Sequence, residues 1–333
     1  MAESGLVIVD KPGGMTSHDV VARIRRLAGT RRVGHAGTLD PMATGVLVIG
    51  VEKATRLLGY LTLTEKEYDG TIRLGQSTVT DDAEGEVLPA GEGLAADPAT
   101  IPEAELRSAL GAFVGKISQV PPRISAIKVD GKRAYRLTRS GAAPELAARP
   151  VTISRLDVLA TRQAGEGLLD LDVAVTCSSG TYIRAIARDL GAALGTGGHL
   201  TALRRTRVGP YGIAAARTLG QLTERFEHIA LAEAASAAFR SIRLNAEEAR
   251  LVSHGGRLPA ASHLRPVTGP AEGAAATGAG TAASSGEETA AVSGDESTAA
   301  SGVPVAAFAP DGTLTALLVQ QDGEMRPLAV FVP

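Results

Sequence analysis

Cysteine, aromatic residues and long apolar runs are all scarce in this chain of 333 residues. Its single cysteine, Cys177, cannot form an internal disulfide or build a cysteine-rich zinc site. Tryptophan is absent and aromatic residues make up only 3% of the chain, so each tyrosine inside a motif attracts notice. No window approaches the ~18 uninterrupted apolar residues that a membrane span needs. The sequence therefore predicts a protein that does not enter membranes.

Targeting signals and cofactor motifs are missing as well. The N-terminal stretch MAESGLVIVDKPGG carries an early acid and lacks the apolar core of a secretory signal, so we expect a cytoplasmic protein. The chain has no G-x-x-x-x-G-K-[ST], no H-E-x-x-H and no histidine pair at metal-ligand spacing, and no G-x-G-x-x-G follows the first predicted strand. We therefore expect neither a metal nor a cofactor. The sequence does not set the oligomeric state, and a monomer is our default expectation.

The formal net charge of −2 hides an uneven distribution. Residues 1–266 hold 33 basic and 28 acidic side chains, whereas residues 267–302 hold five acids and no base. Within the first part, basic residues gather in three clusters, at Arg23–Arg32, Arg123–Arg139 and Arg204–Arg207. Such clusters suit a phosphate backbone, and a solvated helix face is the alternative for any one of them.

The last third of the chain combines a low-complexity segment with a β-rich end. The segment at about 267–302 is nearly all Ala, Gly, Ser, Thr and Glu, so it cannot bury enough apolar surface to fold and we expect disorder. After it, two Asp-Gly pairs, at 311–312 and 322–323, separate short β-like runs in the manner of hairpins. The upstream stretch Ile242–Leu258 can pair with these runs.

The first 230 or so residues alternate strand-like and helix-like segments. Apolar spacing predicts strands at Leu6–Val9, Val46–Val51, Tyr68–Leu74, Val151–Leu159 and Leu168–Thr176. It also predicts three helices: one that Thr16 or Ser17 caps, one at Lys53–Leu63 and one at Tyr182–Leu194. The pattern is typical of an α+β fold around a mixed, mainly antiparallel sheet. We expect a catalytic domain at 1–240 and a small β-rich domain at 241–333 that contains the disordered insertion.

One loop stands out for its composition. The stretch GHAGTLDPMATG, residues 34–45, contains three glycines and a proline, which force a tightly specified loop that leads into a buried strand. Asp40 lies at its centre, and the alternative to a functional carboxylate is a turn residue before Pro41. His35 and the preceding arginine cluster favour an anionic ligand at this loop.

Six separated motifs, in order along residues 5–225, resemble those of one known family. They are VDKP with GMTS at 9–17, GHAGTLDPMATG at 34–45, KEY with RLG at 66–75, PP with SAIK at 121–128, CSSGTYIR at 177–184 and HL with LRR at 199–205. The sequence resembles the bacterial tRNA pseudouridine-55 synthases, the TruB family. After residue 240 this family often carries a small β domain of PUA-like fold, and the acidic insertion here departs from that pattern.

The resemblance implies an isomerase of pseudouridine-synthase fold. Its reaction converts one uridine in the T-loop of tRNA, at position 55, to pseudouridine without a cofactor. The family's essential carboxylate matches Asp40, as a nucleophile or an electrostatic stabiliser. A buried carboxylate needs a fixed cation to stay ionised, and Arg184 is the matching position. Tyr68 matches a tyrosine that stacks on the base and can accept a proton from the sugar; a tyrosine that only packs in its strand is the alternative.

The resemblance also implies substrate-binding residues. A T-loop uridine is stacked, so it must be extracted, and His35 matches the residue that fills the gap. Tyr182 and Leu203 match residues that line the pocket, although Leu203 also suits the core, and Lys11 matches a motif that supports the catalytic loop. The expected partner is tRNA, held at its T-arm with phosphate contacts from the basic clusters. Cys177 stays outside this set as a buried structural thiol.

Two other functions remain open at this point. An RNA-binding module without catalysis would use the basic surface and the C-terminal β domain, with Asp40 in a structural role. A pseudouridine synthase acting on ribosomal RNA would share the catalytic aspartate. The contexts GHAGTLDPMATG and CSSGTYIR resemble the tRNA enzymes more closely.

Overall fold

The computed structural model describes residues 2–89, 96–122, 124, 128–129, 132–133, 146–259, 266–267 and 302–332. The segment at about 267–302, for which we expect disorder, lies outside the described residues apart from its two ends. Most of the basic cluster Arg123–Arg139 also lies outside them. No helix in the described part of the chain is long and apolar enough to cross a membrane.

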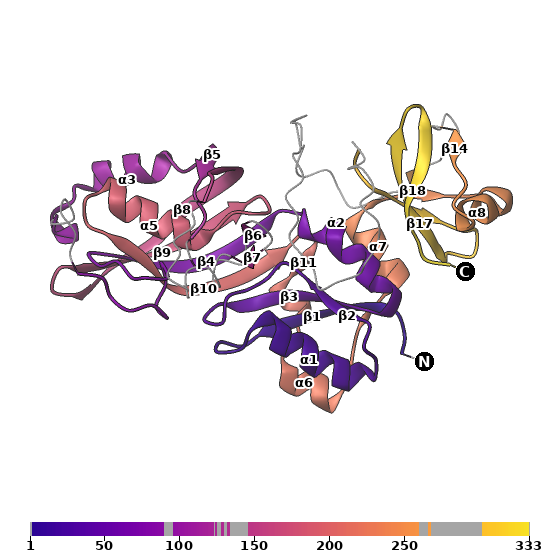
Figure 1. Ribbon diagram of the computed structural model, residues 1–333, viewed down its shortest axis with the longest axis horizontal. Coiled ribbons are helices and arrows are strands. Elements are labelled where there is room, and N and C mark those ends of the chain that lie inside the picture. Colours follow the sequence, from indigo (N-terminus) through magenta and orange to yellow (C-terminus); the bar gives the residue numbers. More distant parts are fainter. Residues whose placement is uncertain are drawn as a thin grey trace.

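A large mixed sheet forms the body of the molecule (Figure 1). Its strands follow the order β12 (Ile229–Ala230), β1 (Gly5–Lys11), β3 (Thr44–Val51), β10 (Gly198–Val208), β4 (Lys66–Leu74), β9 (Leu168–Cys177), β8 (Arg149–Gly165) and β5 (Gly115–Gln119). Two short strands join this path, β2 (Val33–Ala36) beside β3 and β11 (Tyr211–Gly212) beside β10. Neighbours are antiparallel except β3 and β10, which are parallel. The predicted α+β fold with a mixed, mainly antiparallel sheet is confirmed.

The helices begin where the sequence provides caps. Helix α1 (Ser17–Ala28) starts with a capping box between Thr16 and Asp19, and it ends at Gly29 in the left-handed conformation. Further helices in the described part of the body include α3 (Glu103–Gly111), α5 (Ile183–Ala193), α6 (Leu219–Glu224) and α7 (Leu231–Ala238), with short 3-10 turns η2 (Pro98–Thr100) and η3 (Ile213–Ala215). Apolar residues of α1 and α5 pack in one core with strands β3, β4 and β9.

The segment predicted as a helix at Lys53–Leu63 is helical, but its first half is not an α-helix. The structure has a 3-10 helix η1 (Glu52–Leu57) followed by a short α-helix α2 (Leu58–Thr62). Glu52 has a positive φ of 53°, and the Thr55 hydroxyl donates to the Glu52 carbonyl at 2.7 Å. Such a local side-chain bond competes with regular α-helical bonding and favours the tighter turn.

A second sheet is formed by the C-terminal part. Its order is β14 (Leu258–Pro259), β18 (Glu324–Val330), β17 (Leu314–Gln321), β16 (Val305–Phe308), β13 (Arg240–Arg243) and β15 (Pro266–Val267), with α8 (Ala246–Ser253) packed beside it. A separate two-stranded ribbon pairs β6 (Lys128–Val129) with β7 (Lys132–Arg133). The two predicted Asp-Gly turns join β16 to β17 and β17 to β18, and Gly312 and Gly323 both have positive φ. The expected pairing of these strands with Ile242–Leu258 is also confirmed, through β13 and β14.

The two sheets share an apolar contact. Leu317 and Phe331 from the C-terminal part belong to the same buried cluster as Leu57 and Leu58 from the body. Figure 1 shows the second sheet at one end of the long axis, next to α2 and α7, with α3 and α5 at the other end. The second sheet is therefore packed against the body and is not merely tethered to it.

The parallel junction of β3 and β10 fixes the loop that carries Asp40. Gly45, the last residue of that loop, pairs with Arg205 and has a φ of +97°. A Cβ atom at this position would lie 2.2 Å from the Arg205 carbonyl oxygen. Only glycine fits here, because both the backbone conformation and the close approach exclude a side chain.

Candidate active site

A cavity of about 110 Å³ opens between the Asp40 loop, strands β4 and β10, and the start of α5. This volume is several times the ~10–15 Å³ that one water molecule needs. Five of the seven residues selected from the sequence line this cavity. The described residues that line it are Gly37, Thr38, Leu39, Asp40, Thr62, Lys66, Tyr68, Ser178, Ser179, Gly180, Thr181, Tyr182, Ile183, Arg184, Leu203 and Arg205. The structure thus brings Asp40, Tyr68, Tyr182, Arg184 and Leu203 together.

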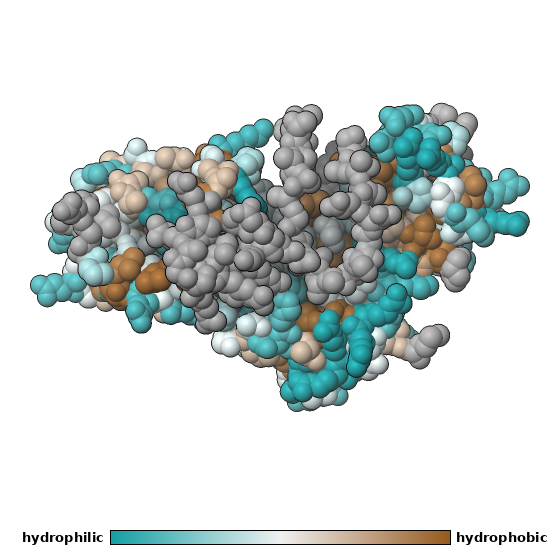
Figure 2. All heavy atoms as spheres, in the orientation of Figure 1, coloured by the Kyte–Doolittle hydropathy of each residue, from teal (hydrophilic) through white to brown (hydrophobic). Residues whose placement is uncertain are grey.

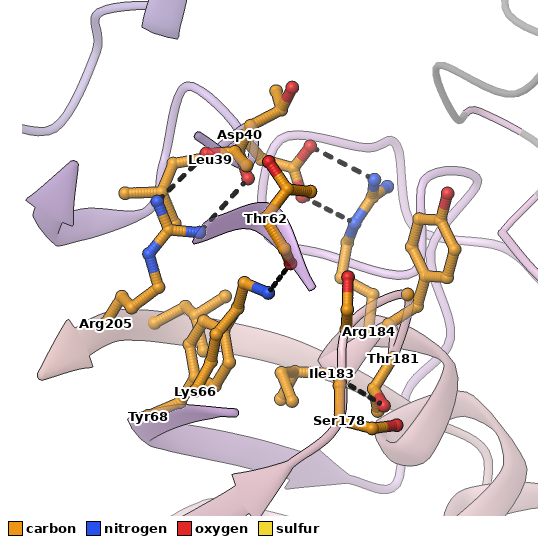
Figure 3. Close-up of a pocket in the computed structure, with 16 residues that line it drawn as sticks. Leu39, Asp40, Thr62, Lys66, Tyr68, Ser178, Thr181, Ile183, Arg184 and Arg205 are labelled. Atoms are coloured by element: carbon orange, nitrogen blue, oxygen red, sulfur yellow. Dashed lines mark hydrogen bonds and ion pairs between the residues drawn. The ribbon is translucent and has the colours of Figure 1, made fainter. Parts of the chain in front are cut away.

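Asp40 and Arg184 form the predicted ion pair. Nε of Arg184 lies 3.0 Å from Oδ2 of Asp40, and Nη2 lies 3.2 Å from Oδ1 (Figure 3). The Arg184 side chain is 6% exposed and the Asp40 side chain is 36% exposed. A planar guanidinium with two nitrogens facing two carboxylate oxygens holds the carboxylate in one orientation. Asp40 therefore lines the cavity with its carboxylate held in one orientation.

Arg184 has a second carboxylate partner that sequence reasoning missed. Nη1 lies 3.4 Å from Oδ2 of Asp82, whose side chain is 3% exposed, and it donates to the Thr80 carbonyl at 2.8 Å. Nη2 also donates to the Ile124 carbonyl at 3.2 Å. Asp82 is held in turn by the Thr80 hydroxyl at 2.5 Å and the Glu84 amide at 3.0 Å. Two anions and two carbonyls thus fix the guanidinium from several sides.

The Lys11 side chain hydrogen-bonds to the backbone of the Asp40 loop and of the turn after β1. Its ammonium donates to the carbonyls of Met15 at 2.6 Å, Pro12 at 2.9 Å and Pro41 at 3.1 Å. The side chain is fully buried, and burial lowers the pKa of Lys11. Because Pro41 directly follows Asp40, these bonds connect strand β1 to the backbone beside the carboxylate. The role of Lys11 in supporting the loop stays a prediction.

Arg205 and Lys66 are further buried cations that the sequence did not single out as site residues. Arg205 is 1% exposed and donates to the carbonyls of Val46 at 2.7 Å and Gly37 at 3.0 Å, so it joins the two ends of the Asp40 loop. The Lys66 ammonium donates to the Thr62 carbonyl at 2.7 Å. Figure 3 shows both side chains on the side of the cavity away from Arg184. Cationic groups therefore border the cavity on two sides.

Tyr68 lies on the floor of the cavity. It is 7% exposed, and burial raises the pKa of its phenol. Near neutral pH the phenol therefore keeps its proton, which suits stacking and hydrogen bonding better than unassisted proton abstraction. The ring lies on strand β4 with Lys66, and Leu203, 8% exposed, lines the cavity from β10. Tyr182 lines it at the start of α5.

His35 does not line the cavity. It lies in β2, is 6% exposed, and makes an edge-to-face contact with His18 at a centroid distance of 5.6 Å. Burial lowers the pKa of His35 to about 4, so the imidazole is neutral near pH 7. A residue that replaces an extracted base must reach the RNA, and this geometry holds the ring inside the protein. The role of His35 stays a prediction.

The members of the cluster Arg204–Arg207 are engaged within the protein, and their contact with phosphates stays a prediction. Arg205 is buried, and its two basic neighbours are paired within the protein. Arg204 lies 2.8 Å from Asp10, while Arg207 lies 2.8 Å from a Glu65 oxygen and 2.7 Å from a Glu67 oxygen. The cluster on α1 differs, because Arg23, Arg26 and Arg31 are exposed, and Figure 2 shows hydrophilic side chains gathered over the α1 region.

No group of three or more His, Cys, Asp or Glu residues within the described ranges has metal-binding geometry. Cys177 is buried at the end of β9, and burial raises the pKa of its thiol to about 11. A protonated thiol is a poor nucleophile, which favours the structural interpretation of Cys177.

Two family models match the chain in sequence. One, described as the N-terminal domain of the TruB family pseudouridylate synthases, covers residues 25–183, and the tRNA pseudouridylate synthase B C-terminal domain covers residues 184–249. The chain belongs to the TruB family of pseudouridylate synthases. It is therefore an isomerase, and the resemblance inferred from six motifs is confirmed.

Curated relatives match over nearly the whole chain. A protein from Arthrobacter sp. (strain FB24) is 55% identical over 331 residues, covering 99% of this chain and 97% of the relative. One from Thermobifida fusca (strain YX) is 54% identical over 330 residues, covering 98% of each. A third, from Mycobacteroides abscessus, is 64% identical over 224 residues, which are 67% of this chain and 74% of the relative. All three are named tRNA pseudouridine synthase B.

Solved structures share the fold at lower identity. An H/ACA RNP bound to a substrate RNA containing 2'-deoxyuridine matches with a TM-score of 0.65 and 23% identity, covering 99% of this chain and 85% of the matched chain. A Cbf5-Nop10-Gar1 complex matches with a TM-score of 0.64 and 25% identity, covering 99% and 84%. These matches support the assignment of the fold.

Proposed function

We propose that this pseudouridine synthase acts on tRNA and isomerises the uridine at position 55 in the T-loop. The observation that carries the proposal is the Asp40 carboxylate, paired with Arg184 at 3.0 Å and open to a cavity floored by Tyr68. The name shared by the curated relatives supports tRNA as the substrate class. The choice of the T-loop uridine rests on the six sequence motifs.

The geometry suits a rearrangement within one nucleotide. The target base leaves its stack, at a cost of a few kcal/mol, and enters the cavity above Tyr68. Asp40, oriented by Arg184, acts as a nucleophile or stabilises positive charge on the nucleotide while the bond from N1 to C1′ breaks. The base then rotates, C5 bonds to C1′, the proton on C5 leaves, and N1 gains a proton, so the atoms balance without a co-reactant.

The remaining sequence expectations complete the proposal. Residues 1–240 would form the catalytic domain and residues 241–333 a PUA-like β domain that contacts the RNA. Tyr182 and Leu203 would hold the base, Lys11 would support the catalytic loop, and His35 would occupy the space that the base leaves. We expect a cytoplasmic monomer that works on the T-arm of tRNA without a metal or cofactor.

Tritium release tests the reaction directly. Two unmodified tRNA transcripts carry ³H at C5 of uridine. One is labelled at position 55 alone and the other at all uridines except position 55, and each is incubated with wild-type protein or with Asp40→Asn. Forming the bond from C5 to C1′ must expel the label, so wild type should release about one equivalent from the first transcript and none from the second, and Asp40→Asn should release none. Binding of both proteins to the same tRNA is measured in parallel.

Each other outcome has a defined meaning. Release from other uridines would refute the choice of position 55. Release by Asp40→Asn at the wild-type rate would refute the role of the carboxylate. No release by wild type, with tRNA still bound tightly, would favour an RNA-binding module over an enzyme of this specificity.

A further inference from the structure

A buried glutamine outside the cavity holds the start of α5. Gln119 is the last residue of β5 and is 3% exposed. Its side-chain Oε1 accepts from the backbone amide of Tyr182 at 2.8 Å, and its Nε2 donates to the Tyr182 carbonyl at 3.1 Å. One amide side chain thus satisfies both main-chain groups of a single residue, as a neighbouring strand would.

The residue that Gln119 holds is the one at which α5 begins. Tyr182 is the N-cap and provides no side-chain capping bond of its own. Its carbonyl accepts from the amides of Ala185 at 3.1 Å and Ile186 at 3.3 Å, which starts the helix. Helix N-termini need such fixed partners because their first amides lack intrahelical acceptors. Gln119 therefore fixes, from another strand, where the first turn of α5 lies.

That first turn carries two residues of the active site. Tyr182 lines the cavity, and Arg184 makes the ion pair with Asp40. Two further bonds join α5 to the backbone that follows Gln119. Arg188 donates to the Val120 carbonyl at 2.7 Å, and Arg184 donates to the Ile124 carbonyl at 3.2 Å. Gln119, Val120 and Ile124 thus each hydrogen-bond to α5 or its N-cap, and the bond to Ile124 comes from the guanidinium that pairs with Asp40.

We propose that Gln119 is a positioning residue for the isomerisation, which sets the first turn of α5 so that Arg184 meets Asp40 in the reactive orientation. It is not among the described residues that line the cavity, so it acts through Tyr182 and Arg184 and does not touch the base. The inference rests on the proposed function of Asp40. A small displacement of a catalytic group costs up to ~100-fold in rate, so a residue beyond the cavity can control turnover.

Two substitutions separate this role from general stability. Gln119→Glu is nearly isosteric. In its ionised form the carboxylate has no proton to donate to the Tyr182 carbonyl, and the partial negative charge of that oxygen repels it. Gln119→Leu removes both bonds without adding charge. We expect single-turnover tritium release to slow by about 10- to 100-fold in both variants. In an Asp40→Asn background, the dissociation constant for tRNA should change by less than about threefold, because the RNA surface is intact.

The matched control is Gln163→Glu. Gln163 is an exposed glutamine on β8 whose Nε2 donates to the Gly165 carbonyl, and it does not line the cavity. Its variant should keep the wild-type rate. Thermal unfolding of every variant identifies any protein that fails to fold, and the nearly isosteric Gln119→Glu keeps the test valid if Gln119→Leu is unstable.

A double-mutant cycle shows whether Gln119 acts through Arg184. If it does, Gln119→Leu combined with Arg184→Lys should be no more than about threefold slower than Arg184→Lys alone. Multiplying effects would overturn this route, and a wild-type rate in both single variants of Gln119 would overturn the inference while leaving the proposed function intact. A wild-type protein that releases no tritium would overturn both.

Discussion

Replacing Arg184 by methionine and by lysine separates charge from geometry at the centre of the site. The guanidinium faces Asp40 at 3.0 Å and Asp82 at 3.4 Å, and it donates to two backbone carbonyls. Methionine fills much of the same volume and leaves both carboxylates without this cation. Lysine restores one positive charge, but a single ammonium cannot face two carboxylates and two carbonyls in the same fork geometry.

The expected magnitudes follow from burial. Removing one partner of a buried ion pair costs ~3–5 kcal/mol, because the other charge is left uncompensated. The Asp82 side chain is 3% exposed and the Asp40 side chain is 36% exposed, so most of the loss comes from Asp82. We expect Arg184→Met to lower the free energy of unfolding by about 3 kcal/mol and Arg184→Lys by about half as much. Turnover should fall by about 1000-fold and 100-fold, or ~4 and ~2.7 kcal/mol of barrier.

Urea unfolding and single-turnover tritium release near pH 7 measure the two effects. Arg162→Met is the control, because Arg162 forms an exposed ion pair with Asp172 on the large sheet outside the cavity. It should leave both turnover and stability nearly unchanged. Wild-type turnover in Arg184→Met would refute the role of the ion pair. Wild-type turnover in Arg184→Lys would refute the narrower argument that the fork geometry matters.

Three further predictions concern the Asp40 loop and its neighbours. Burial lowers the pKa of His35 to about 4 from its ordinary value of 6.5, so the unfolded state binds more protons between these pH values. His35 should therefore contribute a loss of about 3 kcal/mol of stability as pH falls from 6.5 to 4; urea unfolding of His35→Gln should show a smaller loss than wild type, and an equal loss would contradict the assignment. Gly45→Ala places a Cβ atom 2.2 Å from the Arg205 carbonyl oxygen and should lower stability by ~3 kcal/mol or more in thermal unfolding, whereas Gly59→Ala, with no atom within 4 Å of the new Cβ, should not. Lys11→Met removes three bonds to carbonyls and should slow single-turnover release by about 10-fold or more at unchanged tRNA affinity; equal loss of affinity and rate would argue against a supporting role.

Local signals in the sequence predicted much of the fold. The capping box at Thr16 and the two Asp-Gly turns are governed by neighbouring residues, so they could be located without knowledge of the tertiary structure. The 3-10 start of the segment at Glu52 could not, because it depends on a positive φ at that residue. The pairing of β3 with β10 also required the structure, since it joins strands far apart in the chain.

The site likewise contains residues that local motifs predict and residues that only tertiary contacts reveal. Asp40 and Arg184 could be selected because each lies in a dense motif, and the structure brings them within 3.0 Å. Asp82 lies in an ordinary turn-like stretch, TDDAEG, where several acids compete and no local signal says which one is buried against a cation. Gln119 is a single uncharged residue whose partner is a backbone far along the chain. Contacts of this kind are set by packing, and propensity and spacing carry no information about them.

The arginine clusters show that the sequence alone does not say whether a run of basic residues is exposed. The secondary structure of the run decides which side chains reach the surface. Successive residues of a strand point to opposite faces, so on β10 Arg205 enters the core while Arg204 meets Asp10. The pairing of β10 with β4 is irregular between Arg205 and Arg207, and Arg207 meets Glu65 and Glu67 instead of following Arg205 into the core. On a helix, residues three apart share a face, so Arg23 and Arg26 are exposed side by side on α1. The same density of arginine therefore gives a buried side chain that holds the Asp40 loop in one place and an exposed cationic surface in the other.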